Sequence, residues 1–474
     1  MSIRLEDLPV AVIGAGPVGL AAAAHLAERG IPFTVLEAGG TPAAAVRQWG
    51  HVRLFSPWRF NVDAAARRLL AEAGWVEPDP DVLPTGGQLA DDYLQPLADL
   101  PALKPHVRYD TRVLAITRLG LDRLRTAGRD AAPFLIRLAD GEDVLARAVI
   151  DASGTWGTPN VLGAAGIPAH GESAAAGFVE HALPDVLGAD RDRFAGKRTL
   201  VVGAGHSAAN TLLSLAELTG KAPGTGVVWA IRSASPARTY GGQAADALPA
   251  RGALGSRLRE HVRSGTITLV TNFSVRSVTV TDGRVVVSDG SDSITVDRIV
   301  SATGFRPDHG VASELRLDLD PIMGSTRALA PLIDPNQHSC GTVPPHGVDE
   351  LTHPEPGYYA IGVKSYGRAP TFLLATGYEQ ARSVVAALAG DWDAARDVQL
   401  DLPETGVCNS NPVPDTDTID AGGGCCGTPA AEAVPAGRGL ATGIAGGLLS
   451  APLALLPVAS SPDKADGKDG GCCG

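Results

Sequence analysis

Three glycines and one acidic residue near the N-terminus have the spacing that a dinucleotide-binding turn requires. Gly14, Gly16 and Gly19 follow a short apolar run, and Glu37 closes a second one. The first glycine allows a tight turn, the second lets backbone approach a pyrophosphate, and the third permits close packing of helix on strand. A carboxylate at the end of the second run suits ribose hydroxyls. The pattern therefore indicates binding of an adenine dinucleotide with a free ribose.

The elements that must position these residues form a βαβ unit. We predict a strand over 10–13, an Ala-rich helix that ends at Glu28, and a second strand over 33–36. Pro17, at the start of the helix, is a further candidate for cofactor binding. The helix N-terminus would offer free N–H groups and its positive dipole end to phosphates.

The same pattern recurs in the middle of the chain. Segment 198–209 again predicts a strand, a turn of small residues and an Ala-rich helix, and the strand after it ends on Arg232 instead of an acid. Because an arginine fits a 2′-phosphate, we interpret the second unit as an NADPH site. A solvated charge at a strand end is the alternative reading of Arg232. The candidates here are Gly203, Gly205, His206, Ser207, Ala208 and Arg232.

Further strands and one helix complete the expected α/β organisation. Trp49 is a further candidate for cofactor contact; its aromatic segment either lines a flat ring or only packs over the first domain. Gly154 and Gly362 are candidates because they are small residues at strand ends. Pro370 and Thr371 are candidates because they suit a helix start. We predict meander strands at 107–119, 134–138 and 143–148, buried strands at 148–154 and 357–362, strands at 266–270, 275–280 and 284–287, and a helix from 371 to about 388.

Composition restricts the class of protein. A chain of 474 residues is long enough for two or three domains, and a formal net charge of −12 argues against a nucleic-acid partner. The first strand begins within ten residues of Met1, so we expect no signal peptide and a cytoplasmic location. Segment 439–460 has the length of a membrane span, but its glycines, Pro452 and Pro457 make membrane association an unfavoured reading.

The six cysteines all lie at or beyond Cys340, which excludes a disulfide framework spread over the fold. From 401 onward Gly, Ala and Pro dominate, and we expect a disordered tail. Within it Cys408, Cys425 and Cys426 are candidate thiolate ligands for a soft metalloid; passive thiols are the alternative. Cys340 is the candidate for contact with a thiophilic substrate. It shares a loop with His338, His346 and His353, at a spacing that matches no common zinc pattern.

These motifs resemble flavoproteins with two dinucleotide-binding domains, of the flavin-containing monooxygenase-like group. The resemblance covers about 1–400 and rests on GAGPVG with Glu37, GAGHSA with Arg232, and ATGFRPD at 302–308, which places Thr303 and Gly304 among the cofactor-binding candidates. More narrowly, HVRLFSPW, SYGRAPTFLLATGYEQ and the cysteine-bearing tail look like flavin monooxygenases encoded with bacterial arsenic-resistance genes.

The resemblance implies an α/β fold with two Rossmann-like three-layer domains. The FAD domain would comprise 1–165 and 305–400, the NADPH domain would be inserted at 166–304, and 401–474 would form the tail. Two departures stand out. The family fingerprint, FxGxxxHxxx followed by an aromatic residue, is not matched at Gly171, which has no histidine four residues later. Gly362 is followed by Val363 where many relatives have aspartate.

The resemblance also implies the chemistry. Hydride would pass from NADPH to FAD, and the reduced flavin would activate O₂ and oxygenate a small soft nucleophile such as a trivalent (organo)arsenical. No side chain need act as acid or base. One alternative is reduction of a disulfide or metal by the terminal Cys472-Cys473 pair; another is a tail that only binds metalloid.

Overall fold

The computed structural model describes residues 4–241, 249–335, 343–369 and 372–400. Cys340, Pro370, Thr371 and the whole segment 401–474, with the other five cysteines and the expected tail, lie outside the described residues.

A parallel five-stranded sheet contains the first glycine motif. Its strand order is β16-β7-β1-β2-β3, with bounds Val10–Ile13 (β1), Phe33–Leu36 (β2), Val107–Arg108 (β3), Ala148–Asp151 (β7) and Tyr358–Ala360 (β16). Every residue of β1, β7 and β16 is buried. Such continuous burial is expected of parallel strands that are covered on both faces.

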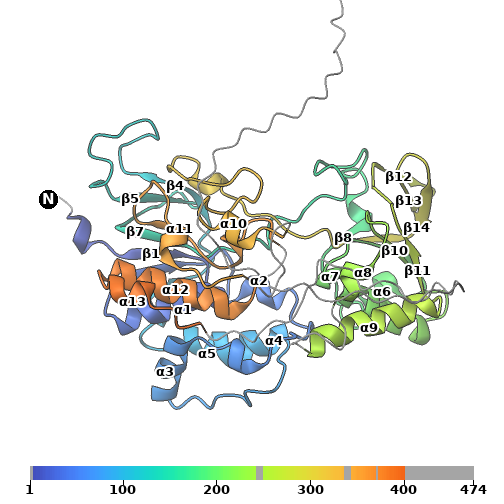
Figure 1. Ribbon diagram of the computed structural model, residues 1–474, viewed down its shortest axis with the longest axis horizontal. Helices are drawn as coiled ribbons and strands as arrows, with labels where there is room; N and C mark the ends of the chain where they lie inside the picture. Colours follow the sequence, from blue (N-terminus) through green and yellow to red (C-terminus); the bar gives the residue numbers. More distant parts are fainter. Residues whose placement is uncertain (1–3, 242–248, 336–342, 370–371, 401–474) are drawn as a thin grey trace, which may run out of the picture. The chain divides into compact units, whose positions relative to one another are not determined.

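Helices cover one face of this sheet and a β-meander covers the other (Figure 1). Val10 and Val12 of β1 pack against the helices, whereas Ala11 and Ile13 pack against the meander. The sequence of β1 is apolar throughout because both faces of the strand are buried. The helices are α1 (Pro17–Glu28), α3 (Ala64–Glu72) and α12 (Leu374–Leu388); the meander strands are β4 (Val113–Arg118), β5 (Phe134–Leu138) and β6 (Asp143–Ala146).

A second five-stranded sheet repeats this three-layer plan around the second glycine motif. Its order is β11-β10-β9-β15-β8, with bounds Val179–His181 (β8), Arg198–Val202 (β9), Gly226–Ala230 (β10), Ile267–Val270 (β11) and Arg298–Ser301 (β15). One face packs on α7 (His206–Lys221) and α9 (Pro249–Arg263), and the other on a meander of β12 (Ser277–Thr281), β13 (Arg284–Ser288) and β14 (Ser293–Val296). The α/β class with two Rossmann-like units is confirmed.

Short helices and turns make up the rest. They are η1 (Leu5–Asp7), α2 (Ala44–Arg47), η2 (Trp58–Phe60), α4 (Gly86–Gln88), η3 (Leu89–Leu94), α5 (Gln95–Ala98), η4 (Lys104–His106), η5 (Ala176–Phe178), α6 (Arg191–Phe194), α8 (Ala237–Tyr240), η7 (Gly310–Ala312), α10 (Ala330–Ile333), α11 (Val348–Leu351), η8 (Gly362–Lys364) and α13 (Trp392–Arg396).

The segment predicted as one meander strand over 107–119 is two strands in different sheets. β3 extends the parallel sheet, and only β4 belongs to the meander. Asp110 between them has φ +52°, in the left-handed region, so an extended strand cannot run through it. The backbone N–H groups of Asp110 and Thr111 donate to carbonyls of Gly39 and Glu37, which fixes the turn beside β2.

A buried cluster of charges anchors the meander. Glu355, just before β16, accepts hydrogen bonds from Arg118 Nε at 2.7 Å and from Arg129 Nη2 at 2.7 Å. The three side chains are at most 2% exposed. Burial alone would raise the pKa of Glu355, but the hydrogen bonds from Arg129, the Arg316 backbone and Arg118 hold it below its ordinary value.

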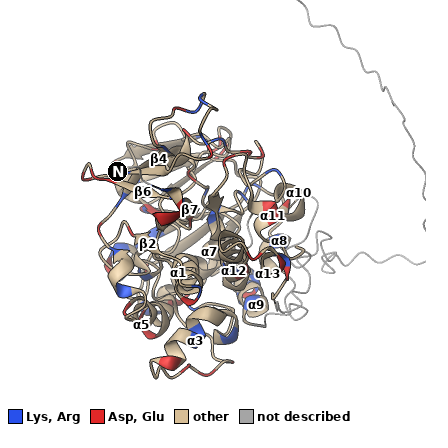
Figure 2. Ribbon diagram, turned by 90° about the vertical axis from the view of Figure 1, so that its left-hand side faces the viewer, with Lys and Arg blue, Asp and Glu red and all other residues tan. Residues whose placement is uncertain are grey.

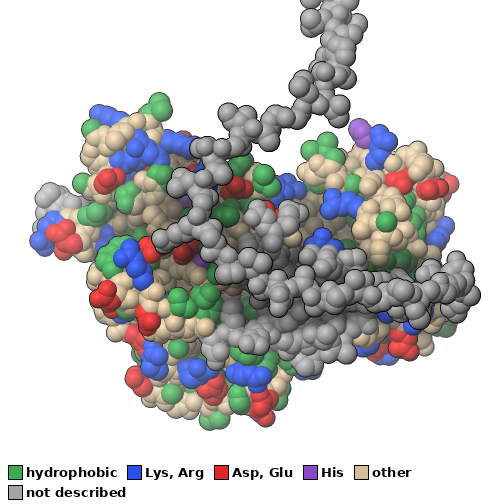
Figure 3. All heavy atoms as spheres, in the orientation of Figure 1, with side chains coloured by type: hydrophobic (Ala, Val, Ile, Leu, Met, Phe, Trp, Pro, Cys, Tyr) green, Lys and Arg blue, Asp and Glu red, His purple; other side chains and the backbone are tan. Residues whose placement is uncertain are grey.

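Charged side chains of both signs are interspersed elsewhere. Helix α3 carries Arg67, Arg68 and Glu72, and Figure 2 shows both colours on it. In the face drawn in Figure 3, basic and acidic side chains both appear on the described surface. No helix in the described ranges combines the length and the apolar character needed to cross a membrane.

His353 should make the stability of the protein depend on pH. The side chain is 4% exposed, its Nδ1 accepts from Asp318 N–H, and burial lowers its pKa from 6.5 to about 4. Between these values the unfolded chain binds more protons than the folded one, so stability falls as the pH drops from 6.5 to 4. The shift corresponds to at most about 3 kcal/mol.

Denaturant unfolding of the wild type and of His353→Asn at several pH values would measure this effect. Asparagine keeps an acceptor for Asp318 N–H but does not titrate, so the variant should lose less stability on acidification. A residual slope is expected, because burial also lowers the pKa values of His309 and His346. Parallel profiles for the two proteins would refute the assignment to His353.

Candidate nucleotide-binding sites

The first glycine turn, between β1 and α1, has the shape of a phosphate cradle. Gly14 has φ +97°, and a Cβ on it would lie 3.0 Å from the carbonyl oxygen of Ala152. A Cβ on Gly19 would lie 2.0 Å from the Gly14 oxygen, so the packing of the helix on the turn demands glycine there. A Cβ on Gly16 would meet nothing within 4 Å. The fold therefore leaves open space at the N-terminus of α1, where a pyrophosphate fits.

Glu37 is held at the rim of this cradle. Its Oε2 accepts a hydrogen bond from Ala15 N at 2.6 Å, and its Oε1 accepts one from Gly39 N at 2.7 Å. Each carboxylate oxygen retains further acceptor capacity. The side chain is thus oriented by backbone and can still accept from ribose hydroxyls.

Gly154 and Gly362 border the same edge of the sheet. Both have positive φ, +71° and +72°, and a Cβ on Gly362 would lie 3.4 Å from Val18 at the start of α1. The N–H of Gly362 donates to Gln380 Oε1 at 2.8 Å. Gly362 would therefore serve a cofactor by allowing close approach rather than by donating its N–H.

The two tryptophans of the aromatic segment that follows Glu37 lie in different surroundings. Trp58 is 2% exposed and belongs to the core. Trp49 is half-buried and covers Gly86, where a Cβ would lie 2.6 Å from the indole ring. Of the two tryptophans, Trp49 remains the candidate for contact with a ring, and that role stays a prediction.

The second glycine turn, between β9 and α7, reproduces the first. Gly203 has φ +139°, and a Cβ on it would lie 2.1 Å from the Ala302 oxygen, whereas a Cβ on Gly205 would meet nothing within 4 Å. Trp229 Nε1 donates to the Gly203 carbonyl at 2.7 Å and fixes the turn. Ala208 is fully buried against the sheet. A second cradle is therefore present at the N-terminus of α7.

The polar candidates of the second unit lie around this cradle. His206 and Ser207 are the first two residues of α7, and the His206 ring lies 5.1 Å from that of Phe55. Arg232 is exposed just beyond β10, and its Nη1 donates to the Ala164 carbonyl at 3.1 Å. The long side chain is therefore held at the same end of the sheet as the glycine turn.

Thr303 and Gly304 lie at a crossover, the place where the two chain segments that connect the sheets meet. Thr303 Oγ1 donates to the Asn160 carbonyl at 2.9 Å, and Asn160 Nδ2 donates back to the Thr303 carbonyl at 3.0 Å. Phe305 pairs with Pro159 and stacks on Trp156. The Thr303 hydroxyl is thus engaged in joining the two segments. The sequence analysis missed Asn160, which nothing in its local sequence distinguishes.

A buried ion pair at the end of β7 was also missed. Asp151 Oδ2 accepts from Lys364 Nζ at 2.6 Å and from the Tyr358 hydroxyl at 3.0 Å. Burial alone would raise the pKa of Asp151, but Lys364 and Ser153 bring it below its ordinary value. The sequence signal for this pair was an aspartate at the end of an otherwise apolar strand.

The fingerprint can also be aligned in a second register. Measured from Gly177 rather than Gly171, a histidine does stand four residues later: His181, the last residue of β8, with Ala175 in place of the phenylalanine. Asp185 stands where the fingerprint has an aromatic residue, so the fingerprint is matched only in part in this register. The histidine lies at the carboxyl end of a strand of the second sheet.

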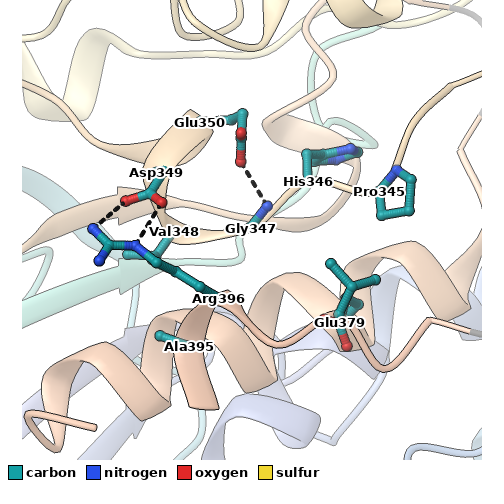
Figure 4. Close-up of a pocket in the computed structure, with 10 residues that line it drawn as sticks. Pro345, His346, Gly347, Val348, Asp349, Glu350, Glu379, Ala395 and Arg396 are labelled. Atoms are coloured by element: carbon teal, nitrogen blue, oxygen red, sulfur yellow. Dashed lines mark hydrogen bonds and ion pairs between the residues drawn. The ribbon is translucent and has the colours of Figure 1, made fainter. Parts of the chain in front are cut away.

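A separate cavity of about 160 Å³ lies between α11, α12 and α13 (Figure 4). The charged residues of its lining have partners: Arg396 binds Asp349, Glu350 accepts from Gly347 N, and Glu379 binds Arg382. His346, on its wall, contacts Gln380, the side chain that holds Gly362. The cavity thus adjoins the first nucleotide-binding site through Gln380, and its lining does not indicate a second active site.

Metal ligands are not assembled in the described ranges, where no group of three or more His, Cys, Asp or Glu side chains could hold an ion. Cys408, Cys425 and Cys426 fall outside those ranges, as does Cys340, and their proposed roles remain predictions. His346 and His353 each hydrogen-bond to neighbouring groups within the core.

Comparisons with known proteins identify the family of the chain. A model of the family described as pyridine nucleotide-disulphide oxidoreductase matches residues 11–339. Indole-3-pyruvate monooxygenase YUCCA1 of Oryza sativa subsp. japonica is 32% identical over 210 residues, and YUCCA6 of Arabidopsis thaliana is 30% identical over 207. Each match covers 43% of this chain and 44% of the relative, so the chain spans less than half the length of these relatives.

Solved structures show the same fold at low sequence identity. Bacillithiol disulfide reductase of Bacillus cereus has a TM-score of 0.59 at 18% identity and covers 81% of this chain and 99% of its own. The cadaverine monooxygenase DfoA of Erwinia amylovora has a TM-score of 0.57 at 14% identity, covering 88% and 100%. Flavin-containing monooxygenase of Stenotrophomonas maltophilia has 0.51 at 21%, covering 80% and 99%.

Proposed function

Because the chain belongs to the pyridine nucleotide-disulphide oxidoreductase family, and is therefore an FAD-dependent oxidoreductase, we propose that it is an NADPH-dependent monooxygenase of a soft nucleophile. The observation that carries the proposal is the pair of glycine cradles, one with a carboxylate and one with an arginine at the rim. The curated relatives named as monooxygenases support oxygenation as the reaction class.

The proposal divides the chain into an FAD domain, 1–165 with 305–400, and an inserted NADPH domain, 166–304, followed by the segment 401–474. The crossover at Asn160 and Thr303 supports these boundaries, since both chain passages between the sheets meet there. The first cradle would hold the pyrophosphate of FAD, and Glu37 its ribose. The second would hold the pyrophosphate of NADPH.

Bound FAD would supply the redox chemistry, accepting hydride from the nicotinamide and activating O₂. The protein's own residues would bind and orient the two cofactors and shield them from water. The glycine turns would bring backbone N–H groups to the phosphates, and Trp49 is proposed to cover a ring. The substrate proposed is a small soft nucleophile, with a trivalent arsenical as the leading candidate from the sequence resemblance.

Arg232 should determine the preference for NADPH over NADH. If its guanidinium binds the 2′-phosphate, Arg232→Gln removes hydrogen bonds to a charged group, which are worth about 1.5–3 kcal/mol. The ratio of the NADPH to the NADH rate at low coenzyme concentration should then fall roughly tenfold to hundredfold. Anaerobic stopped-flow bleaching of FAD measures both rates.

Arg257→Gln, an equivalent change at an exposed position on α9, serves as the control and should leave the ratio unchanged. An unaltered ratio in Arg232→Gln would remove the 2′-phosphate assignment and leave Arg232 as a solvated strand-end charge.

The reaction class is tested by oxygen stoichiometry. The holoenzyme with NADPH and ¹⁸O₂ is offered a trivalent phenylarsenical, indole-3-pyruvate or a low-molecular-weight disulfide. The proposal expects the arsenical to raise O₂ uptake in step with NADPH oxidation and to yield product carrying one ¹⁸O atom. The same result with indole-3-pyruvate alone, whose keto carbonyl is an electrophile, would support oxygenation but contradict a soft nucleophile as the substrate. Anaerobic NADPH oxidation driven by the disulfide alone would favour the rival function, a disulfide reductase.

A thiol-dependent reduction remains the second candidate because the structural neighbours include a bacillithiol disulfide reductase. Against it, the sequence has no cysteine before Cys340, so neither nucleotide unit contains a dithiol within its own sequence. Metalloid binding by Cys408, Cys425 and Cys426 is an additional role for the tail. Arsenite affinity that survives replacement of all three by serine would exclude it.

A further inference from the structure

A buried, closed hydrogen-bond ring joins two oppositely charged residues at the carboxyl edge of the first sheet. The Lys364 and Asp151 side chains are 2% and 0% exposed, and Lys364 Nζ lies 2.6 Å from Asp151 Oδ2. Ser153 Oγ donates to Asp151 Oδ1 at 2.6 Å and accepts from Lys364 Nζ at 3.0 Å. Each charge thus has the other as its buried counter-ion.

The ring lies directly against the first glycine cradle. Asp151 pairs in register with Ile13, the residue before Gly14. The next residue, Ala152, has its carbonyl oxygen 3.0 Å from a Cβ built on Gly14. Lys364 ends the short helix that begins at Gly362. Ligands of parallel α/β sheets bind outside the carboxyl ends of the strands, so the ion pair lies beside the place where FAD is proposed to bind.

Stability alone gives no reason for this pair. Removing two charges from water is costly, and well-packed apolar residues often replace a buried ion pair without loss of stability. The neighbouring groups add no net charge: the Tyr358 hydroxyl donates to Asp151 and burial raises its pKa well above the ordinary value, while burial lowers the pKa of His309. The cluster thus carries no net charge while Lys364 and Asp151 are both present, and it gains a net charge when only one of the two is removed.

We propose that Lys364 and Asp151 are positioning residues that set the reduction potential of the bound FAD, with the ammonium cancelling a carboxylate that would otherwise oppose reduction. Two-electron reduction of FAD near neutral pH takes up two electrons and one proton, so the reduced ring gains negative charge. Because interactions between charges are strong in a poorly solvated interior, an uncompensated carboxylate at this edge favours the oxidised form. This inference rests on the proposed FAD site but not on the oxygenation reaction.

The test measures the midpoint potential of protein-bound FAD, by anaerobic reduction with dithionite in equilibrium with a reference dye. Lys364→Met leaves the carboxylate uncompensated and should shift the equilibrium at least tenfold toward oxidised FAD, which is about 30 mV for a two-electron couple. The double variant Asp151→Asn with Lys364→Met has no buried charge and should return toward the wild-type potential. Lys221→Met, the same change at an exposed site on α7, is the matched control.

The comparison between Lys364→Met and the double variant decides the proposal, since the two proteins share the lost lysine and differ only in the charge of residue 151. Equal potentials in both would overturn it and leave the pair a structural contact. If Lys364→Met does not fold, Lys364→Arg replaces it: retained charge should preserve the potential, and a shift of tenfold or more would overturn the proposal. A wild-type protein without FAD would instead refute the proposed cofactor site.

Discussion

Replacement of Gly16 by alanine is expected to give a folded protein that binds FAD more weakly than the wild type. A methyl group at this position meets no protein atom within 4 Å, and its φ of −77° is accessible to alanine, so folding should be unaffected. The same methyl group would occupy the space at the N-terminus of α1 that a pyrophosphate needs. Overpacking of this kind costs about 1–3 kcal/mol, so FAD should bind roughly 5-fold to 150-fold more weakly.

Flavin absorbance after purification and titration of the apoprotein with FAD would measure the loss. Gly220→Ala, near the end of α7 where a Cβ also meets nothing within 4 Å, is the matched control and should retain FAD. Gly19→Ala should lose both FAD and stability, because its Cβ would lie 2.0 Å from the Gly14 oxygen. Normal FAD affinity in Gly16→Ala would show that the pyrophosphate does not pass over this turn.

Replacement of Glu355 by glutamine is expected to destabilise the protein by about 3–5 kcal/mol, the cost of breaking a buried ion pair from one side. Arg118 and Arg129 would remain buried with no opposite charge, although Arg118 also donates to backbone carbonyls and lies over the Phe134 ring. The cluster ties the β4–β5 hairpin to the turn before β16. Denaturant unfolding of the two proteins at neutral pH measures the difference.

Glu142→Gln provides a matched control for this change. Glu142 also binds an arginine, Arg108, through two hydrogen bonds, but both side chains are exposed. Solvent screens such a pair, so its loss should leave the unfolding midpoint within experimental error. If the two glutamine variants behaved alike, burial would not be what makes the Glu355 cluster important.

The fold was largely predictable because its signals are local. The strands β1 and β2, helix α1 and the turn between them depend on apolar runs and on glycines that the packing requires, and all were predicted at the observed bounds. The split of 107–119 into two strands was not predictable in this way. It depends on a left-handed residue, Asp110, and on its hydrogen bond to Gly39, which lies far away in sequence.

In the candidate site, the positions of the glycine turns and strand ends were predictable, but the contacts between distant side chains were not. Glycine positions and strand-end charges follow from spacing, so both cradles were located. The pairing of Asp151 with Lys364 joins residues 213 positions apart, and the crossover of Asn160 on Thr303 joins residues 143 positions apart. Contacts of this kind arise from tertiary packing and leave no periodic trace in a single sequence.

The central claim, that the two cradles hold different cofactors, is tested most directly by anaerobic mixing of NADPH with purified Gly205→Ala protein. Gly205 occupies the second cradle as Gly16 does the first, with no atom within 4 Å of its Cβ. The account predicts that this variant contains FAD like the wild type, yet its flavin bleaches much more slowly at low NADPH and at the normal rate with dithionite. Loss of FAD from Gly205→Ala, or bleaching by NADPH at the wild-type rate, would contradict the assignment of NADPH to the second cradle.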